Sequence, residues 1–555
     1  MSSGPAAPAD SGDNGRRDSI GRASLFLASG TIVSRILGFV SAIILAQTID
    51  VTGPGDAFAL ATTLPNNIYA IIAGGVLTAV LVPQIVKASR DPDGGSRYVN
   101  KIITLGFIVF FGVAVLATLA APLLVALYAE QASDGSRGFS PEVVALATAL
   151  AYWCLPQVLF FALYSLLGEV LNARKVFGPY TWAPVVNNVV MIAGLLVFAA
   201  IFSGDVSDAS VWTPDMIALL GGSATLGIAA QAFVLFLFWR RAGLSFRPDF
   251  RWRGVGLAQT GKAAGWVFGM ILVTQLSGIV HNRVASLAVA DGEPSLAVLR
   301  FSWLIFMLPH SVVAVSLGTA YYTRMSAHAR DGRRDLLRAD MGTSIRQISM
   351  VMVLASVGLA IVSGPFARVF DDDPSIVEGM ARVLVAFMIG LVPFSMLFIT
   401  QRVFYALDDT RTPFFIQAAQ AGIFVSLAAV VATLPSAWIA PGIALITTIA
   451  GTSQTLLSLI ILRGRLGGIG MRLTLRRLAT FWLAAIPASG VGLALALGLG
   501  AFEGGAARDS VASAIVSMLL IGGAMTATYA GALAVLRVPE FWAVTDPIVR
   551  RLRRR

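Results

Sequence analysis

The sequence predicts an all-α polytopic membrane protein with about 14 transmembrane helices. Two observations point to this class: 56% of the 555 residues are hydrophobic and only 13% are charged, and the apolar residues collect in runs long enough to cross a bilayer. A soluble globular domain carries about 25% charged residues. A soluble fold is therefore excluded.

Each predicted span has the length that a bilayer requires, about 20 mostly apolar residues. Fourteen stretches meet this requirement: residues 24–47, 56–88, 99–128, 141–173, 178–202, 214–240, 257–289, 296–326, 337–364, 375–407, 411–434, 438–464, 475–501 and 508–536. The number is even, so both termini are predicted on the same side of the membrane.

Basic residues alternate between the connections. Residues 87–101, 240–253 and 324–338 are rich in Lys and Arg, whereas the intervening loops hold Arg137, Arg368, Arg508 and more than half of the acidic residues. By the positive-inside rule, this pattern predicts that both termini lie in the cytoplasm. The net charge of +11 then reflects topology and attraction to anionic membrane lipids, and a nucleic-acid partner is not required.

Two pairs of similar motifs predict an internal repeat. LPNNIYAIIAG at residues 64–74 resembles LPHSVVAVSLG at residues 308–318, and EVLNARKVFGPY at 169–180 resembles RVFYALDDTRTPFF at 402–415. Spans 1–6 and 7–12 are therefore interpreted as parallel repeats, as in transporters whose substrate cavity lies between two lobes. The alternative is chance recurrence of Leu, Pro and Gly in an apolar chain.

The resulting organisation has five parts. They are a disordered cytoplasmic tail (1–19), an N-terminal lobe of spans 1–6 (20–240), a C-terminal lobe of spans 7–12 with its basic linker (241–464), spans 13 and 14 (465–537) and a basic cytoplasmic tail (538–555).

Catalytic motifs are missing from the sequence. Cys154 is the single cysteine, none of the three histidines is spaced as HExxH, and no GxxxxGK[ST] phosphate loop occurs. We therefore expect no catalytic residue, no metal site and no cofactor, and the sequence does not identify a coupled ion.

Charged residues within the spans are the site candidates, because a charge at mid-bilayer costs about 2.5–3.5 kcal/mol. Arg35 lies near the middle of span 1, Arg283 lies near the outer end of span 7, and Asp56 and Arg300 open spans 2 and 8 at equivalent repeat positions. For the last three, an interfacial position is the plain alternative to a function.

An interior arginine favours an anionic ligand, since the guanidinium fork suits phosphate. Polar residues on spans 1 and 2, including Ser41 and Asn66, are candidates for contacts to sugar or peptide groups. Helix packing explains them equally well. The predicted substrate-binding residues are Arg35, Arg283, Arg300, Asn66 and Ser41.

Five ordered blocks carry a family resemblance: SRILGF at 34–39, DAFALATTLPNNIYAIIAGGVLTAVLVP at 56–83, GEVLNARKVFGPYTWAPVVNN at 168–188, LPHSVVAVSLGTA at 308–320 and FYALDDTRTPFF at 404–415. They resemble the MurJ (MviN) lipid II flippases of the MOP exporter superfamily, in a divergent, actinobacterial-type branch. The resemblance implies alternating-access transfer of the undecaprenyl-diphosphate-linked peptidoglycan precursor to the outer leaflet, without enzymatic chemistry.

It further implies two six-helix lobes around a cationic cavity, a groove for the lipid tail at spans 13 and 14, and the lipid-linked precursor, anionic lipids and cell-wall synthesis proteins as partners. Arg35 and Asp56 match the family pattern. Ser41, Tyr69 and Leu304 stand where family members commonly have arginine.

Two hypotheses follow from these departures. Arg300, one helical turn before Leu304, replaces the missing charge together with Arg283. Asp56 and Arg300 also pair as a gate across the outer mouth.

Other functions stay open at this point. They are an exporter of another lipid-linked oligosaccharide, a drug antiporter, a membrane glycosyltransferase of cell-wall synthesis and a non-transporting scaffold. The antiporter needs a carboxylate inside the lobes. The glycosyltransferase needs one in an outer loop, where Asp371 is the candidate.

Overall fold

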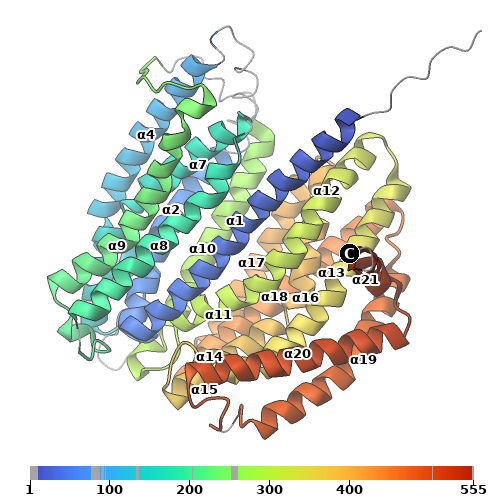
Figure 1. Cartoon of the computed structure of the whole chain (residues 1–555). Coiled ribbons are helices and arrows are strands. Elements are labelled where there is room, and N and C mark those ends of the chain that lie inside the picture. The colour runs from blue at the N-terminus through green and yellow to red at the C-terminus, as the bar shows by residue number, and fades with distance from the viewer. Residues whose placement is uncertain are drawn as a thin grey trace, which may run out of the picture.

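A computed structural model describes residues 11–76, 88, 93, 95–132, 137–174, 176–202, 204–251, 261–502 and 504–552. Within these ranges every regular element is a helix, apart from an isolated bridge between Gln131 and Phe139. Figure 1 shows two groups of long helices, with α1 running obliquely between them. The predicted all-helical class is confirmed.

The first group contains the helices that precede residue 243. They are α1 (Ser11–Ile49), α2 (Pro54–Val76), α4 (Ser96–Leu119), α5 (Ala121–Tyr128), α6 (Pro141–Cys154), α7 (Gln157–Ala173), α8 (Gly178–Ile201), η2 (Ala209–Val211), α9 (Pro214–Val234), η3 (Leu235–Phe238) and η4 (Arg240–Ala242). Helix α8 packs against α1 and α9, α4 packs against α7, and α2 packs against α6.

The second group follows the basic linker. It contains α10 (Gly261–Ser286), η6 (Val289–Asp291), α11 (Leu296–Pro309), the π-helical turn η7 (His310–Ala314), α12 (Val315–Arg330), α13 (Arg334–Ile361), α14 (Ser363–Arg368), α15 (Pro374–Met388), α16 (Leu391–Ala406), α17 (Arg411–Val431), η8 (Ser436–Trp438) and α18 (Ile439–Leu466). Helix α10 packs against α17 and also against α2 of the first group.

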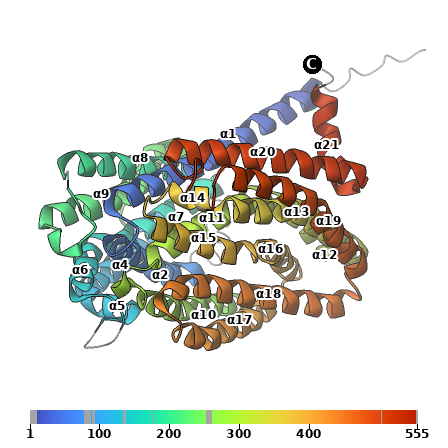
Figure 2. The same cartoon turned by 90° about the horizontal axis from the view of Figure 1, so that it is seen from below.

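Three further helices complete the chain: α19 (Met471–Gly498), α20 (Val511–Val535) and α21 (Pro539–Leu552). Helices α19 and α20 pack against each other and against α13. Seen from below, they lie along the outside of the second group (Figure 2). The lipid-tail groove expected there stays a prediction.

Local sequence signals explain several helix ends. The side chains of Ser140, Thr213 and Ser510 accept hydrogen bonds from the first turns of α6, α9 and α20, as N-cap residues do. Pro309 ends α11 and leads into the π-helical turn. Proline lacks the N–H that a regular helix needs, so a local change of hydrogen bonding is expected there.

The predicted number of fourteen spans is not confirmed. In the part of the chain that the structure describes, eleven helices are long and apolar enough to cross a membrane, or twelve if α15 and α16, which are bent by 43°, form one span. Helices α2 and α10 occupy predicted spans but are not among the eleven. Polar side chains, among them Asn66, Asn67 and His281, lower their mean hydropathy.

The predicted N-terminal tail differs in part. Residues 1–10 lie outside the described residues, whereas residues 11–19, predicted to be disordered, form the first turns of α1. Extending an existing helix costs much less than nucleating one, so polar residues can continue it. The remaining boundaries of the five predicted parts, and the repeat itself, stay predictions.

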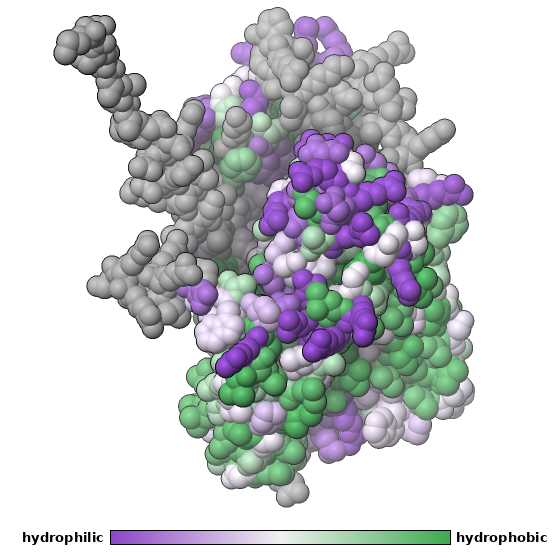
Figure 3. All heavy atoms as spheres, turned by 90° about the vertical axis from the view of Figure 1, so that its right-hand side faces the viewer, coloured by the Kyte–Doolittle hydropathy of each residue, from purple (hydrophilic) through white to green (hydrophobic). Residues whose placement is uncertain are grey.

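The outside of the helical body is apolar. Leu116, Leu519 and Val535 are 68%, 70% and 83% exposed. On the face seen in Figure 3, hydrophobic residues cover the lower part and hydrophilic residues gather in the upper part. Such a surface suits hydrocarbon, in which only helices with satisfied backbones are stable.

Candidate functional site

A cavity of about 500 Å³ lies between α11 and the first group of helices. Its walls come from α1, α2, α7, α8, α9 and α11, so segments up to 270 residues apart in the chain meet there. We call it the arginine cavity, because two arginines line it together with polar and apolar side chains: Arg35, Gly38, Ser41, Ala42, Leu45, Phe58, Thr62, Gln157, Phe161, Asn187, Asn188, Met191, Ala224, Ile228, Arg300, Phe301, Trp303, Leu304 and Met307.

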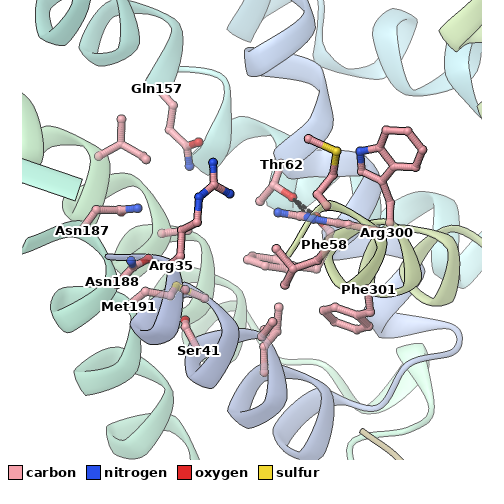
Figure 4. A pocket seen from close by; sticks show the side chains of 18 of the residues that line it. Arg35, Ser41, Phe58, Thr62, Gln157, Asn187, Asn188, Met191, Arg300 and Phe301 are labelled. Atoms are coloured by element: carbon pink, nitrogen blue, oxygen red, sulfur yellow. Dashed lines mark hydrogen bonds between the residues drawn. The ribbon is translucent and has the colours of Figure 1, made fainter. Parts of the chain in front are cut away.

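Arg35 lines this cavity, as the sequence predicts for a substrate-binding residue. Its side chain projects from α1 into the cavity (Figure 4). It forms no hydrogen bond or ion pair with any residue that the structure describes. The guanidinium donors of Arg35 are therefore available to a ligand.

Helix α8 holds this part of α1 in place. Asn188 Nδ2 donates a hydrogen bond to the backbone carbonyl of Ser34, at 2.8 Å. Gly30 allows close contact with Trp182, since a Cβ at Gly30 would lie 2.7 Å from the indole nitrogen. The backbone next to Arg35 is thus anchored while its side chain stays available.

Arg300 enters the same cavity from the opposite side. It projects from α11 and donates a hydrogen bond to the hydroxyl of Thr62 on α2, the dashed line in Figure 4. Leu304, one turn further along α11, also lines the cavity. The two positions share a helix face, as the charge-replacement hypothesis requires.

The two predicted polar contacts on α1 and α2 have different positions. Ser41 is buried and lines the arginine cavity. Asn66 is exposed and lies outside the arginine cavity, whereas its neighbour Asn67 is buried and lines a second cavity described below. The side chains of adjacent residues on a helix point about 100° apart, so Asn66 and Asn67 face different surroundings.

Arg283 does not line the arginine cavity. It forms an ion pair with Glu130 and donates hydrogen bonds to the carbonyls of Ala126 and Leu127, at 3.3 and 3.4 Å. These carbonyls belong to the last turn of α5, where cations are stabilised by the helix dipole. Arg283 thereby joins α10 to the first group.

The predicted ion pair between Asp56 and Arg300 is not formed. Asp56 is fully buried, and its Oδ1 accepts a hydrogen bond from the backbone N–H of Ala297 at 2.7 Å. Ala297 lies in the first turn of α11, which has free N–H groups and a positive dipole end. Asp56 therefore joins α2 to α11 by capping it, without the arginine.

Two more contacts join the groups at the same end. Gln47 Nε2 donates to the carbonyl of Val369 at 2.9 Å. Arg137 donates to the carbonyls of Leu434 and Ala432, at 2.6 and 2.8 Å, beyond the last turns of α17. The predicted outer end of the molecule is thus held closed by contacts from several segments.

Asp371 lies at this closed end, in a short loop between α14 and α15. Burial raises the pKa of its carboxyl to about 6, with a further contribution from nearby acids, Asp50 first among them. It lines a polar pocket of about 420 Å³ with Gln47, Asp50, Asp205, Arg368 and Asp372. The loop spans residues 369–373, whereas the glycosyltransferase alternative calls for a carboxylate in a sizeable outer loop.

Sequence reasoning missed Gln157, Asn187 and Asn188, which supply amide groups to the arginine cavity. The first begins α7 and the other two lie in α8, and no local pattern distinguishes them from packing residues. Among the residues that the structure describes, no group of three His, Cys, Asp or Glu side chains is placed to hold a metal ion.

A family model described as lipid II flippase MurJ matches residues 45–505. The chain belongs to the MurJ lipid II flippase family. The family resemblance seen in the sequence is confirmed.

Two relatives described as probable lipid II flippase MurJ illustrate the distance within the MurJ family. One from Haemophilus influenzae is 25% identical over 405 residues, which cover 69% of this chain and 75% of the relative. One from Rhizobium tropici is 26% identical over 404 residues, which cover 70% and 71%.

Solved structures show the same fold. A lipid II flippase MurJ in an inward closed conformation aligns with a TM-score of 0.68 at 17% identity, covering 92% of this chain and all of the other. An inward-facing multidrug resistance transporter of the MATE family, in the MOP superfamily, aligns with a TM-score of 0.62 at 16% identity, covering 78% and 94%. At these identities the likeness to MurJ and MATE structures concerns the fold.

Proposed function

We propose that this protein transports lipid II, the lipid-linked peptidoglycan precursor, from the inner to the outer leaflet of the plasma membrane by alternating access. It acts as a transporter and not as an enzyme. One observation carries the proposal beyond family membership: Arg35 projects into a cavity between the two groups of helices with no protein partner among the described residues.

The physical problem is the polar headgroup. A diphosphate with attached sugars cannot cross hydrocarbon readily, because each unpaired polar group costs several kcal/mol. In the arginine cavity, Arg35 and Arg300 replace water around the diphosphate, while the polyprenyl tail stays in the lipid. Opening the end held by Asp56, Gln47 and Arg137 then releases the headgroup to the outer leaflet.

The cavity charge argues against a cationic cargo. Among the described residues that line the arginine cavity, two are arginine and none is Asp or Glu. A cation would be repelled there, whereas an anion is stabilised by the guanidinium groups. The fold shared with MATE transporters therefore does not by itself favour a drug antiporter.

Orientation and partners complete the proposal. The basic connections and both termini lie in the cytoplasm, by the positive-inside rule. The end closed by Asp56 and Gln47 then faces outward. Anionic lipids bind the basic connections, and cell-wall synthesis proteins receive the exported precursor.

The test is a leaflet assay in cells depleted of the protein, in which lipid II accumulates on the cytoplasmic side. We expect wild type to restore outer-leaflet lipid II and Arg35→Ala to reduce transport at least tenfold. Arg35→Lys should be intermediate, because lysine keeps the charge but loses the planar fork.

The matched control is Arg382→Ala. Arg382 pairs with Glu378 on α15 and lies outside the arginine cavity, so this variant should transport normally. Transport by Arg35→Ala equal to that of the control, at equal protein levels in the membrane, would contradict the proposal.

A further inference from the structure

A second cavity, of about 530 Å³, lies on the other side of Trp303. Its walls come from α2, α10, α11, η7, α15, α16, α17 and α18. Its volume falls in the range of about 300–1,000 Å³ that is usual for ligand sites. We call it the amide cavity.

The amide cavity is polar but uncharged. Five of the chain's twelve glutamines line it, with two asparagines, and none of its lining residues is Asp, Glu, Lys or Arg. The glutamines are Gln275, Gln401, Gln417, Gln420 and Gln454. Such a wall offers hydrogen bonds to a neutral ligand and no counter-charge to an ion.

Three of these glutamines form a chain. Gln454 Nε2 donates to Gln417 Oε1, and Gln417 Nε2 donates to Gln420 Oε1, both at 2.9 Å. A primary amide has two N–H donors and an acceptor oxygen with two lone pairs. The chain therefore leaves donors and acceptors on each member for a ligand, while it fixes the orientation of the three amides.

Gln275 and Gln401 are available without any rearrangement. They lie on α10 and α16, and neither side chain forms a hydrogen bond with a residue that the structure describes. Glutamine loses rotamer freedom when it is ordered in a protein interior, so packing alone is a weak reason for it. Unused amides at a cavity wall favour a hydrogen-bonding ligand.

Aromatic rings form another part of the wall. Trp303 contacts Phe387 and Phe394 edge-to-face, with ring centroids 5.5 and 5.6 Å apart, and stacks on Phe306 at 4.9 Å. Saccharide rings have an apolar C–H face and a hydroxyl edge. Aromatic faces beside fixed amides fit both parts of such a ring.

A third, smaller cavity lies next to both sites. It has a volume of about 320 Å³ and shares Arg300 and Trp303 with the arginine cavity. With the amide cavity it shares Trp303, Thr63, His281, Asn282, Phe387 and Thr447. The three cavities are therefore adjacent, with Trp303 in the wall of each.

We propose that the amide cavity binds an uncharged saccharide that carries amide groups, as the neutral part of a ligand whose anionic part lies in the arginine cavity. The proposal rests on the proposed function, because the same headgroup supplies both parts. Division of the ligand between two chemically different sites gives specificity, since an unmatched polar group in either site costs free energy.

The test measures binding of a phosphate-free disaccharide with two acetamido groups, N,N′-diacetylchitobiose, to the purified full chain by calorimetry. We expect Gln275→Met and Gln401→Met each to weaken binding at least tenfold, because methionine keeps the side-chain volume without the amide. Gln347→Met is the matched control. Gln347 lies on α13, accepts a hydrogen bond from Tyr321, and lines neither cavity, so its replacement should leave disaccharide binding unchanged.

Two further probes separate the sources of binding. Cellobiose, which lacks acetamido groups, should bind at least tenfold more weakly than diacetylchitobiose. Binding of inorganic pyrophosphate should depend on the variants in the opposite way. Arg35→Ala should weaken it, and Gln275→Met should leave it unchanged.

Several results would overturn the proposal. They are absence of disaccharide binding to wild type, binding that the two glutamine variants leave unchanged, equal binding of cellobiose, or glutamine-dependent binding of an uncharged peptide in place of the disaccharide. Lipid II transport by wild type in proteoliposomes is measured in parallel. Wild type that transports lipid II but fails to bind the disaccharide refutes only this inference, whereas wild type that fails to transport refutes the proposed function.

Discussion

Arg300 and Leu304 lie where the charge-replacement hypothesis requires them. Both residues line the arginine cavity from α11, four positions apart, and Leu304 occupies the position where the family resemblance implies arginine. Arg300 is already held by the hydroxyl of Thr62. The hypothesis is that a guanidinium at position 300 serves the part of the cavity that an arginine at position 304 would reach.

This argument predicts a rescue. Arg300→Ala should lower lipid II transport at least tenfold, and adding Leu304→Arg should restore a large part of it, because positions i and i+4 lie on the same face. The leaflet assay in depleted cells measures both variants. Leu304→Gln in the Arg300→Ala background adds polarity without charge and should not restore transport. If Leu304→Arg restores no more transport than Leu304→Gln in this background, the charge-replacement hypothesis is contradicted.

Helices α8 and α9 illustrate how the elements pack without bulky side chains. Gly194 on α8 faces Ser223 on α9, and a Cβ at Gly194 would lie 2.2 Å from the Ser223 hydroxyl oxygen and 2.4 Å from its Cβ. Gly227 likewise faces Asn187. Small residues let membrane helices approach closely, which here positions Asn187 and Asn188 at the arginine cavity.

Gly194→Ala should therefore destabilise the first group of helices. Overpacking of this kind costs about 1–3 kcal/mol, and we expect a lower thermal unfolding midpoint in detergent. Gly222→Ala is the control on α9, since its new methyl group meets only Trp153 at an ordinary distance of 3.7 Å. Combining Gly194→Ala with Ser223→Gly should recover stability. Equal midpoints for the two single alanine variants would show that the contact is not tight.

The two groups of helices are joined by polar contacts at the predicted outer end and by packing of α2 against α10 and α11. Asp56, Gln47, Arg137 and Arg283 each connect the groups at the predicted outer end. Phe39 of α1 also contacts Phe366 and Phe370 of the second group edge-to-face. Alternating access requires these contacts to break when the predicted outer end opens.

Cross-linking this end should stop transport. Gln47→Cys with Val369→Cys, joined by a short bifunctional thiol reagent, holds the groups in the closed arrangement, because their contact spans 2.9 Å. Tyr321→Cys with Gln347→Cys is the control pair, which cross-links α12 to α13 within one group. The native Cys154 is fully buried and should not interfere. Transport that continues after complete cross-linking of the first pair would exclude opening at this end.

The sequence predicted the fold class and the family best, because both follow from local composition and local sequence blocks. Long apolar runs identified the helical membrane class, and the family blocks identified the lineage. It was less successful in predicting which residues line the cavities. Arg35 and Ser41 were found because a polar side chain in an apolar run is conspicuous, whereas Gln157, Asn188 and the five cavity glutamines resemble ordinary packing residues.

The amino-acid sequence alone established that the protein is a helical membrane protein with an arginine inside a span. Both properties depend on the local segment, because backbone hydrogen bonds in a helix are local and the cost of a charge in the bilayer depends on its place in the span. Only the packed chain showed which polar groups share a cavity and which are already paired. Arg283 was engaged by Glu130, Asp56 capped α11 in place of an ion pair, and Arg35 remained available. These outcomes depend on distances between segments far apart in the chain, and no local pattern encodes them.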